Sequence, residues 1–101
     1  MLIQRIVKMT FKPEYCSDFE EYFATIKDRV GHQPGCSGVK LLKVKSENGV
    51  YFTYSIWDSA EDLERYRHTE LFGQVWPKVK AWFGAKPEAW STEIQAESEP
   101  L

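Results

Sequence analysis

The pattern of apolar and polar residues predicts four β-strands, and in the first and the last of them apolar and polar positions alternate with a period of two. These segments span residues 2–12, 36–46, 50–57 and 90–95. The third, VYFTYSIW, is β-branched and aromatic on both faces, as expected of a strand that is covered on both sides. In the first, one face carries Arg5 among apolar residues, and we assign this face to the helices. Its apolar residues are Ile3, Val7, Met9 and Phe11.

A spacing of three or four between apolar residues predicts a helix between the first two strands. Its apolar stripe consists of Phe19, Tyr22, Phe23, Ile26 and Val30. The helix begins either at a capping box formed by Ser17 and Glu20 or earlier, at Pro13. Gly31 suits a left-handed cap at its end, and residues 32–35 are typical of a turn.

Two further helices are predicted between the third and fourth strands. Ser59 is expected to cap a short helix that extends through Tyr66, and Thr69 is expected to cap a second one. Pro77 lies inside the second helix and is expected to bend or restart it. Gly84 is expected to end it. The chain thus contains a strand, a helix, two strands, a pair of helices and a last strand.

This order predicts an α+β fold of the ferredoxin-like βαββαβ type, with a four-stranded antiparallel sheet and helices on one face. Asn48-Gly49 is a strong signal for a hairpin between the second and third strands. Because two strands are apolar on both sides, the second face needs a partner, and a second copy of the chain is the economical one. We expect a homodimer, a single domain over residues 1–96 and a disordered polar tail over residues 97–101.

Composition excludes several classes of function. The net charge of −2 gives no footprint for nucleic acid or an anionic membrane. No apolar run is long enough to span a bilayer, and the N-terminal residues lack the layout of a signal peptide, so we expect a cytoplasmic protein. Cys16 and Cys36 are then expected to be reduced thiols, and they are not spaced as a metal site. Aromatic residues, at 15%, indicate a bulky core or an aromatic-lined cavity.

Several short motifs, in this order and at this spacing, give the chain a resemblance to a known family. They are Phe11-Lys12-Pro13 after the first strand, Pro34-Gly35-Cys36 before the second, Trp57 at the end of the third with Asp58-Ser-Ala-Glu-Asp-Leu63 after it, and Leu71-Phe72. With these motifs the chain resembles the antibiotic biosynthesis monooxygenase family of dimeric α/β-barrel proteins. This family agrees with the expected homodimer, in which the two sheets pack face to face or close into a shared barrel.

The chain departs from the family at positions that carry chemistry. Many relatives read His-x-x-Ser-x-His-Phe where this chain reads Tyr66-Arg-His68-Thr69-Glu-Leu71-Phe72, so both family histidines are replaced. The haem-degrading branch uses an Asn, a Trp and an iron-binding His at positions that correspond here to Val7, Tyr66 and Trp76. Because an indole cannot replace an axial imidazole, the sequence argues against haem degradation by that route.

The resemblance implies oxygenation of a small aromatic or quinol-type substrate by O2, without a metal or a flavin as cofactor. Such chemistry needs a dry pocket, a proton acceptor and a donor near the developing anion. Arg5 is a candidate to hold an anionic oxygen, and His68 or Tyr66 to move a proton. The candidates for substrate binding are Val7, Trp57, Phe72 and Trp76.

Each candidate also has a structural interpretation. Trp57 and Trp76 are residue types that more often pack in a core. His68 is typical of a solvated helix end, and Arg5 could pair with Glu88 or with Glu93. The protein as a whole could instead bind or isomerise a small molecule without oxygen chemistry, or serve as a dimerisation module in which these rings fill the cavity.

Overall fold

The computed structural model describes residues 2–99, so Met1 and the last two residues of the predicted tail lie outside the described residues. It confirms the predicted ferredoxin-like order of elements. These are β1 (Ile3–Thr10), the short 3-10 helix η1 (Pro13–Tyr15), α1 (Cys16–Gly31), β2 (Cys36–Lys43), β3 (Val50–Trp57), α2 (Ala60–Arg67), α3 (Glu70–Lys80) and β4 (Glu88–Thr92).

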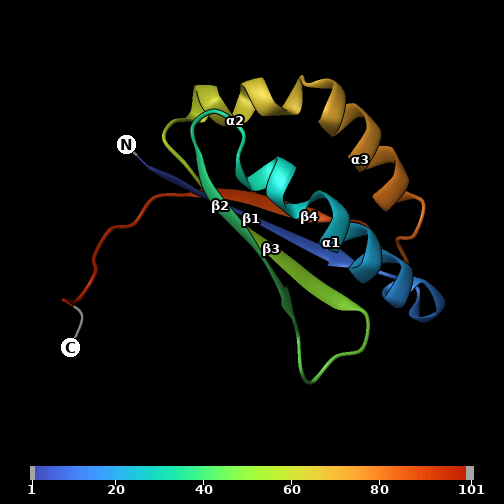
Figure 1. Ribbon diagram of the computed structural model, residues 1–101. Helices are drawn as coiled ribbons and strands as arrows, with labels where there is room; N and C mark the ends of the chain where they lie inside the picture. The colour runs from blue at the N-terminus through green and yellow to red at the C-terminus, as the bar shows by residue number, and fades with distance from the viewer. Residues whose placement is uncertain (1, 100–101) are drawn as a thin grey trace.

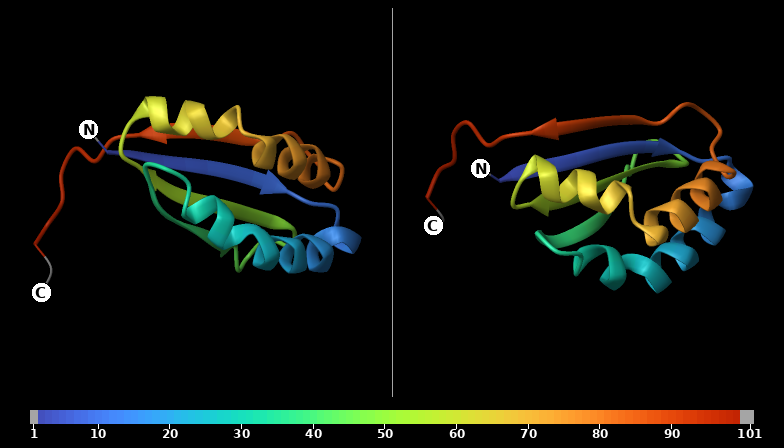
Figure 2. Two further views of the ribbon diagram at one scale, coloured as in Figure 1. Left: turned by 45° about the horizontal axis from the view of Figure 1, so that its top comes forward. Right: turned by 90° about the horizontal axis from the view of Figure 1, so that it is seen from above.

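The four strands form one sheet in the order β2-β3-β1-β4, and every neighbouring pair is antiparallel. Figure 1 shows the helices gathered on one face of this sheet, and Figure 2 shows the same arrangement from two further directions. The other face has no helix of residues 2–99 over it. The two central strands, β3 and β1, therefore lie beneath the helices and supply most of the floor of any space enclosed there.

The ends of α1 differ from two of the sequence expectations. Pro13 opens η1, which leads directly into α1 at Cys16, so the early start is confirmed and Ser17 is not a cap. The expected left-handed cap at Gly31 is wrong. Gly31 is the last helical residue and lies buried against β2, while the left-handed conformation falls on Gly35, with φ of 82°. A glycine is favoured at that point because the turn into β2 needs positive φ.

The caps predicted for α2 and α3 are confirmed. The Ser59 hydroxyl accepts a hydrogen bond from the Asp62 amide at 3.1 Å, and the Thr69 hydroxyl accepts one from the Phe72 amide at 3.2 Å. α3 continues through Pro77 without a restart and ends at Lys80. The expected end at Gly84 is therefore wrong. The Gly84 amide instead donates to the Thr10 carbonyl at 2.8 Å and ties this loop to β1.

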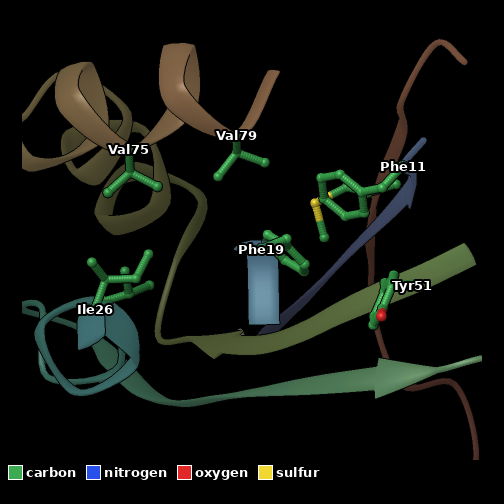
Figure 3. Close-up of a cluster of buried hydrophobic side chains, with 8 residues drawn as sticks. Phe11, Phe19, Ile26, Tyr51, Val75 and Val79 are labelled. Carbon is green, nitrogen blue, oxygen red and sulfur yellow. The ribbon is translucent and has the colours of Figure 1, made fainter. Parts of the chain in front are cut away.

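A core of aromatic and aliphatic side chains joins the helices to one end of the sheet (Figure 3). The Phe11 and Phe19 rings stack with centroids 4.1 Å apart, and Tyr51 meets both rings edge-on. The Tyr51 hydroxyl donates to the Glu20 carboxylate of α1, so a buried polar group finds its partner. Burial and this carboxylate raise the pKa of Tyr51 well above its usual range. This end of the helix–sheet space is closed.

The face of the sheet away from the helices mixes apolar and polar side chains, and on β1 it carries Ile6 between Gln4 and Lys8. On β1 its residues alternate with Arg5 and Val7, and Ile6 pairs with Tyr54 on one side and with Trp90 on the other. Large apolar side chains on and beside this face are strongly exposed in the single chain, namely Leu2, Leu42, Trp90 and Ile94. Clusters of exposed large apolar side chains on a sheet face often mark a surface that a partner covers.

Candidate functional site

A cavity of about 440 Å³ lies between the helices and the sheet, toward the end opposite Phe11 and Tyr51. A volume of this order is typical of small-molecule sites. Its floor comes from β1 and β3, and its walls come from α1, α2 and α3. Most of the lining is apolar. The predicted binding residues Val7, Trp57, Phe72 and Trp76 all belong to it.

The junction between α2 and α3 places a row of aromatic rings along one wall. Tyr66, in the last turn of α2, stacks on Trp57 with ring centroids 5.2 Å apart. Phe72, in the first turn of α3, meets Tyr66 edge-on at 5.3 Å and stacks on Trp76 at 6.0 Å. Because each ring touches the next along the wall, the rings line the cavity and do not fill it.

Trp57 belongs to both the core and the cavity. It is only 1% exposed, so its ring is as buried as any core residue. Its indole N–H donates to the Ser55 hydroxyl at 2.9 Å, which fixes the plane of the ring against the sheet. The two interpretations of Trp57 are thus compatible, because a well-held core ring can present one surface to a cavity.

Tyr66 lies in the cavity wall with its phenol largely removed from water. Burial raises the pKa of Tyr66 to about 12, with smaller contributions from Cys36 and Tyr22. At neutral pH this hydroxyl is therefore protonated. It is suited to donate a hydrogen bond to an anion and is unsuited to take up a proton.

Arg5 points from β1 into the cavity and is half-buried. Its guanidinium donates to the Ser91 hydroxyl of β4 at 3.1 Å. Among residues 2–99 it forms no ion pair, and the suggested pairing with Glu88 or Glu93 is not found, because the Glu88 carboxylate lies 3.9 Å from Lys8 instead. Burial lowers the pKa of Arg5, and the nearby charge of Arg67 lowers it further. The usual pKa of a guanidinium is so high that Arg5 nevertheless stays charged.

His68 is not brought to the cavity. It is the C-cap of α2, its side chain is 75% exposed, and its Nε2 lies 2.9 Å from a carboxylate oxygen of Glu64. The physical reason is its position two residues after Tyr66, which turns it to a different side of the helix. The interpretation of His68 as a solvated helix-end residue agrees with this placement, and in this structure it has no path to a bound substrate.

Arg67 lines the cavity although the sequence analysis did not single it out. A basic residue in the last turn of a short helix is usually read as a solvated partner of the helix dipole. One signal could have identified it. Arg67 follows Leu63 by four residues, and Leu63 is the buried residue of α2. Residues four apart share a face of a helix, so Arg67 extends the inward face of α2.

The fold and this cavity together define a class, the ferredoxin-like proteins that enclose a small-molecule cavity between helices and sheet. Within that class, the chain belongs to the family described as antibiotic biosynthesis monooxygenase, whose model matches residues 2–77. None of the curated proteins with which the sequence was compared matches it.

Solved structures with the same fold cover nearly the whole chain. A protein from Caulobacter crescentus CB15, provisionally assigned as an antibiotic biosynthesis monooxygenase, is 21% identical with a TM-score of 0.86, and the match covers 94% of this chain and 91% of that one. A conserved protein from Methanosarcina mazei Go1 is 14% identical with a TM-score of 0.88, covering 94% of both chains. A mutant of SnoaB, a cofactor-independent oxygenase from Streptomyces nogalater, is 17% identical with a TM-score of 0.82, covering 95% of both.

No helix within residues 2–99 combines the length and the apolar character needed to cross a membrane. The same residues contain no group of three or more His, Cys, Asp or Glu side chains placed to hold a metal ion.

Proposed function

We propose that this protein oxygenates a small aromatic or quinol-type substrate with O2 inside the helix–sheet cavity, using neither metal nor flavin. The observation that carries the proposal is the combination of an apolar aromatic wall with a neutral donor, Tyr66, and a cation, Arg5, in one cavity. The structural likeness to SnoaB, which is described as a cofactor-independent oxygenase, supports the same chemistry.

The reaction balances without an added reductant. A phenol first loses its hydroxyl proton, and the electron-rich phenolate passes one electron to O2. The resulting radical and superoxide combine to form a carbon–oxygen bond at the ring carbon opposite the phenolate oxygen. The peroxide that forms is protonated, its O–O bond breaks, and the ring carbon loses its hydrogen as a proton. One oxygen atom stays in the quinone product and the other leaves as water.

The residues have distinct roles in this proposal. Arg5 holds the phenolate oxygen and lowers the free energy of the anion, because a guanidinium in a water-poor site interacts strongly with negative charge. Tyr66, which is protonated, donates a hydrogen bond to the developing peroxide. The phenol proton leaves to water at the mouth of the cavity. The rings of Trp57, Phe72 and Trp76 hold the substrate by stacking, above Val7.

The proposal includes a homodimer formed through the uncovered face of the sheet. That face carries Ile6, Tyr54 and Trp90 in one continuous row across three strands, with Leu42 beside it. Burying Leu42 and Trp90, each nearly half exposed, against a second copy removes apolar area from water at about 25 cal/mol per Å². A two-fold arrangement places the same patch on both partners, so each copy covers the other.

Oxygen consumption with a panel of hydroxylated naphthalenes and benzene diols tests the oxygenase. We expect uptake with at least one of them, and we expect Arg5→Met and Tyr66→Phe each to slow it strongly. His68→Ala is the matched control, because it changes a titratable residue of the same helix outside the cavity. Equal loss of uptake in His68→Ala and Tyr66→Phe would contradict the assignment of roles.

A binding protein without oxygen chemistry is the second candidate. The titratable residues in the cavity lining are Arg5, Tyr66, Arg67 and Glu88. Glu88 is the carboxylate among them, and it lies beside Lys8. Tight binding of an aromatic ligand, with no oxygen uptake from any compound of the panel, would favour this candidate over the oxygenase.

A further inference from the structure

We propose that the cavity selects aromatic ligands that carry an acidic substituent, and that Arg5 and Arg67 together recognise this acid. The inference rests on the proposed function in one respect, namely that the ligand is an aromatic molecule bound in this cavity. It goes further because it names the chemical class of the substrate and assigns a specificity role to Arg67.

Arg5 has most of its hydrogen-bonding capacity free. A guanidinium carries five N–H donors, and here one of them is given to a neutral hydroxyl, Ser91, at 3.1 Å. Arg5 lies in register between Ser55 of β3 and Ser91 of β4, so its strand neighbours are also neutral. No carboxylate of residues 2–99 comes within ion-pair distance of it. A half-buried cation in this state is stabilised by an anion that enters the cavity.

Arg67 approaches the same space from α2. Burial lowers the pKa of Arg5 most, the charge of Arg67 lowers it further, and the charge of Glu64 acts in the opposite direction. The partner of Arg67 on its own helix is Glu64, at 3.4 Å, in a pair whose side chains are 47% and 58% exposed. Exposed pairs at this spacing contribute little, so Glu64 competes only weakly for the Arg67 guanidinium.

The cavity lining therefore has an excess of positive charge. Glu88 is the acidic residue among the lining residues, and its carboxylate lies 3.9 Å from the Lys8 ammonium. Strand register places Lys8 and Glu88 opposite each other and out of phase with Val7 and Ala89, so both side chains belong to the face away from the helices. Two guanidinium groups then meet the cavity, and the carboxylate that acts on both, Glu64, lies outside the lining and is 58% exposed.

A carboxylate on the ligand fits this arrangement better than a phenolate alone. Guanidinium groups bind planar carboxylates through two parallel hydrogen bonds, which adds geometric selection to charge. A carboxylate is charged throughout the reaction, so it offsets the repulsion between Arg5 and Arg67 from the moment of binding. The neutral Tyr66 hydroxyl, next to Arg67 in the chain, remains available to the reacting oxygen.

A matched pair of probes tests the inference without depending on oxygenation. The probes are 1-hydroxy-2-naphthoate and its amide, 1-hydroxy-2-naphthamide, which have nearly the same shape and differ in charge. Binding is measured anaerobically by the quenching of tryptophan fluorescence in the full-length protein. We expect the carboxylate to bind at least about tenfold more tightly, as is typical of a hydrogen-bonded charged group. Arg5→Met and Arg67→Met should each reduce the ratio toward one.

Arg65→Met is the control variant, because it removes the same charge from the same helix at a residue that pairs with Asp62 outside the cavity. It should keep the tenfold ratio. If Arg5→Met does not fold, Arg5→Lys and Arg67→Met still decide the question. Arg5→Lys should keep some of the preference, because it retains the charge and loses the planar fork.

The outcomes separate this inference from the proposed function. Equal affinity for the two probes in the wild type would overturn the acid preference and leave aromatic binding in the cavity intact. Failure of both probes to bind at millimolar concentration would overturn both. A carboxylate preference that survives in Arg5→Met and in Arg67→Met would also overturn the inference, since it would place the acid elsewhere.

Discussion

The two ends of the space between helices and sheet are both built from aromatic residues, yet one is closed and the other is hollow. At the closed end, Phe11 just after β1, Phe19 of α1 and Tyr51 of β3 meet across the space, and one side of Phe19 also borders the cavity. At the open end, Trp57, Tyr66 and Phe72 touch in a row along one wall. Rings that contact one another across the helix–sheet space fill it, whereas rings that contact one another along one wall leave the space open.

Polar partners account for the same difference. The buried Tyr51 hydroxyl of the closed end has the Glu20 carboxylate as its acceptor. At the open end Arg5 has a single neutral partner and faces a second cation, Arg67. Closing apolar rings over an unpaired cation would remove it from water without compensation, which is strongly unfavourable. Aromatic residues therefore form a closed core where the buried polar groups have hydrogen-bond partners. They line a cavity where a charged group has no ion-pair partner.

The largest effect is expected on stability at the closed end. Phe19→Ala should lower the free energy of unfolding by about 3–5 kcal/mol, because it removes a fully buried ring from a packed cluster. Trp76→Ala, at the half-buried wall, should cost less than half as much and instead weaken the binding of aromatic ligands. Urea unfolding at one fixed protein concentration measures the first effect and fluorescence titration the second. Similar losses of stability in both variants would contradict the distinction between a closed, packed end and an open end.

Two tyrosine variants test the same difference between the closed end and the open end. Tyr66→Phe should leave stability nearly unchanged and slow oxygen uptake by roughly 100-fold, as is typical when one donor to a developing anion is removed. Tyr51→Phe should do the reverse. It should lower stability by about 1 kcal/mol through loss of one hydrogen bond and leave turnover unaffected. Parallel measurements of initial uptake rates and unfolding midpoints check the pair, and an exchange of the two phenotypes would contradict the account.

A second copy bound to the uncovered face of the sheet would contact the sheet beneath both the closed end and the open end. Trp90→Glu places a charge on that face, on the edge strand β4, and should raise the dissociation constant of the dimer by at least tenfold. Ala24→Glu, on the exposed side of α1, is the matched control and should not. Sedimentation at several concentrations measures the change. A wild-type protein that stays monomeric at micromolar concentration would remove the homodimer from the account.

The smallest effect is expected in alkaline solution. Because burial raises the pKa of Tyr66 from 10.0 to about 12, the folded state holds a proton that the unfolded state loses between these values. The contribution of Tyr66 is thus fully present below pH 10.0 and is lost as the pH rises toward about 12. Tyr66→Phe should flatten part of this decline, measured as unfolding midpoints against pH. An unchanged slope would show that the phenol is hydrated.

Most of the fold could be predicted from the sequence because strand and helix periods, the Ser59 and Thr69 caps and the hairpin glycine act locally. Errors fell at Gly31 and Gly84, where contacts with β2 and β1 determine where the chain turns, and at strand ends, since β2 stops at Lys43 and β4 spans Glu88–Thr92. In the site, the aromatic candidates could be predicted because they recur on one side of the helical segment that follows Trp57. Arg67 could not be separated from a solvated helix end by residue type alone, and the exposure of His68 depended on its rotation about α2.

The most direct test of the central claim follows the two atoms of isotopically labelled O2 through a single turnover with a hydroxylated naphthoate. The account predicts one labelled atom in the quinone product and the other in water, with turnover roughly 100-fold slower in Tyr66→Phe and unchanged in His68→Ala. Tight binding of the substrate without any label in the product would contradict it.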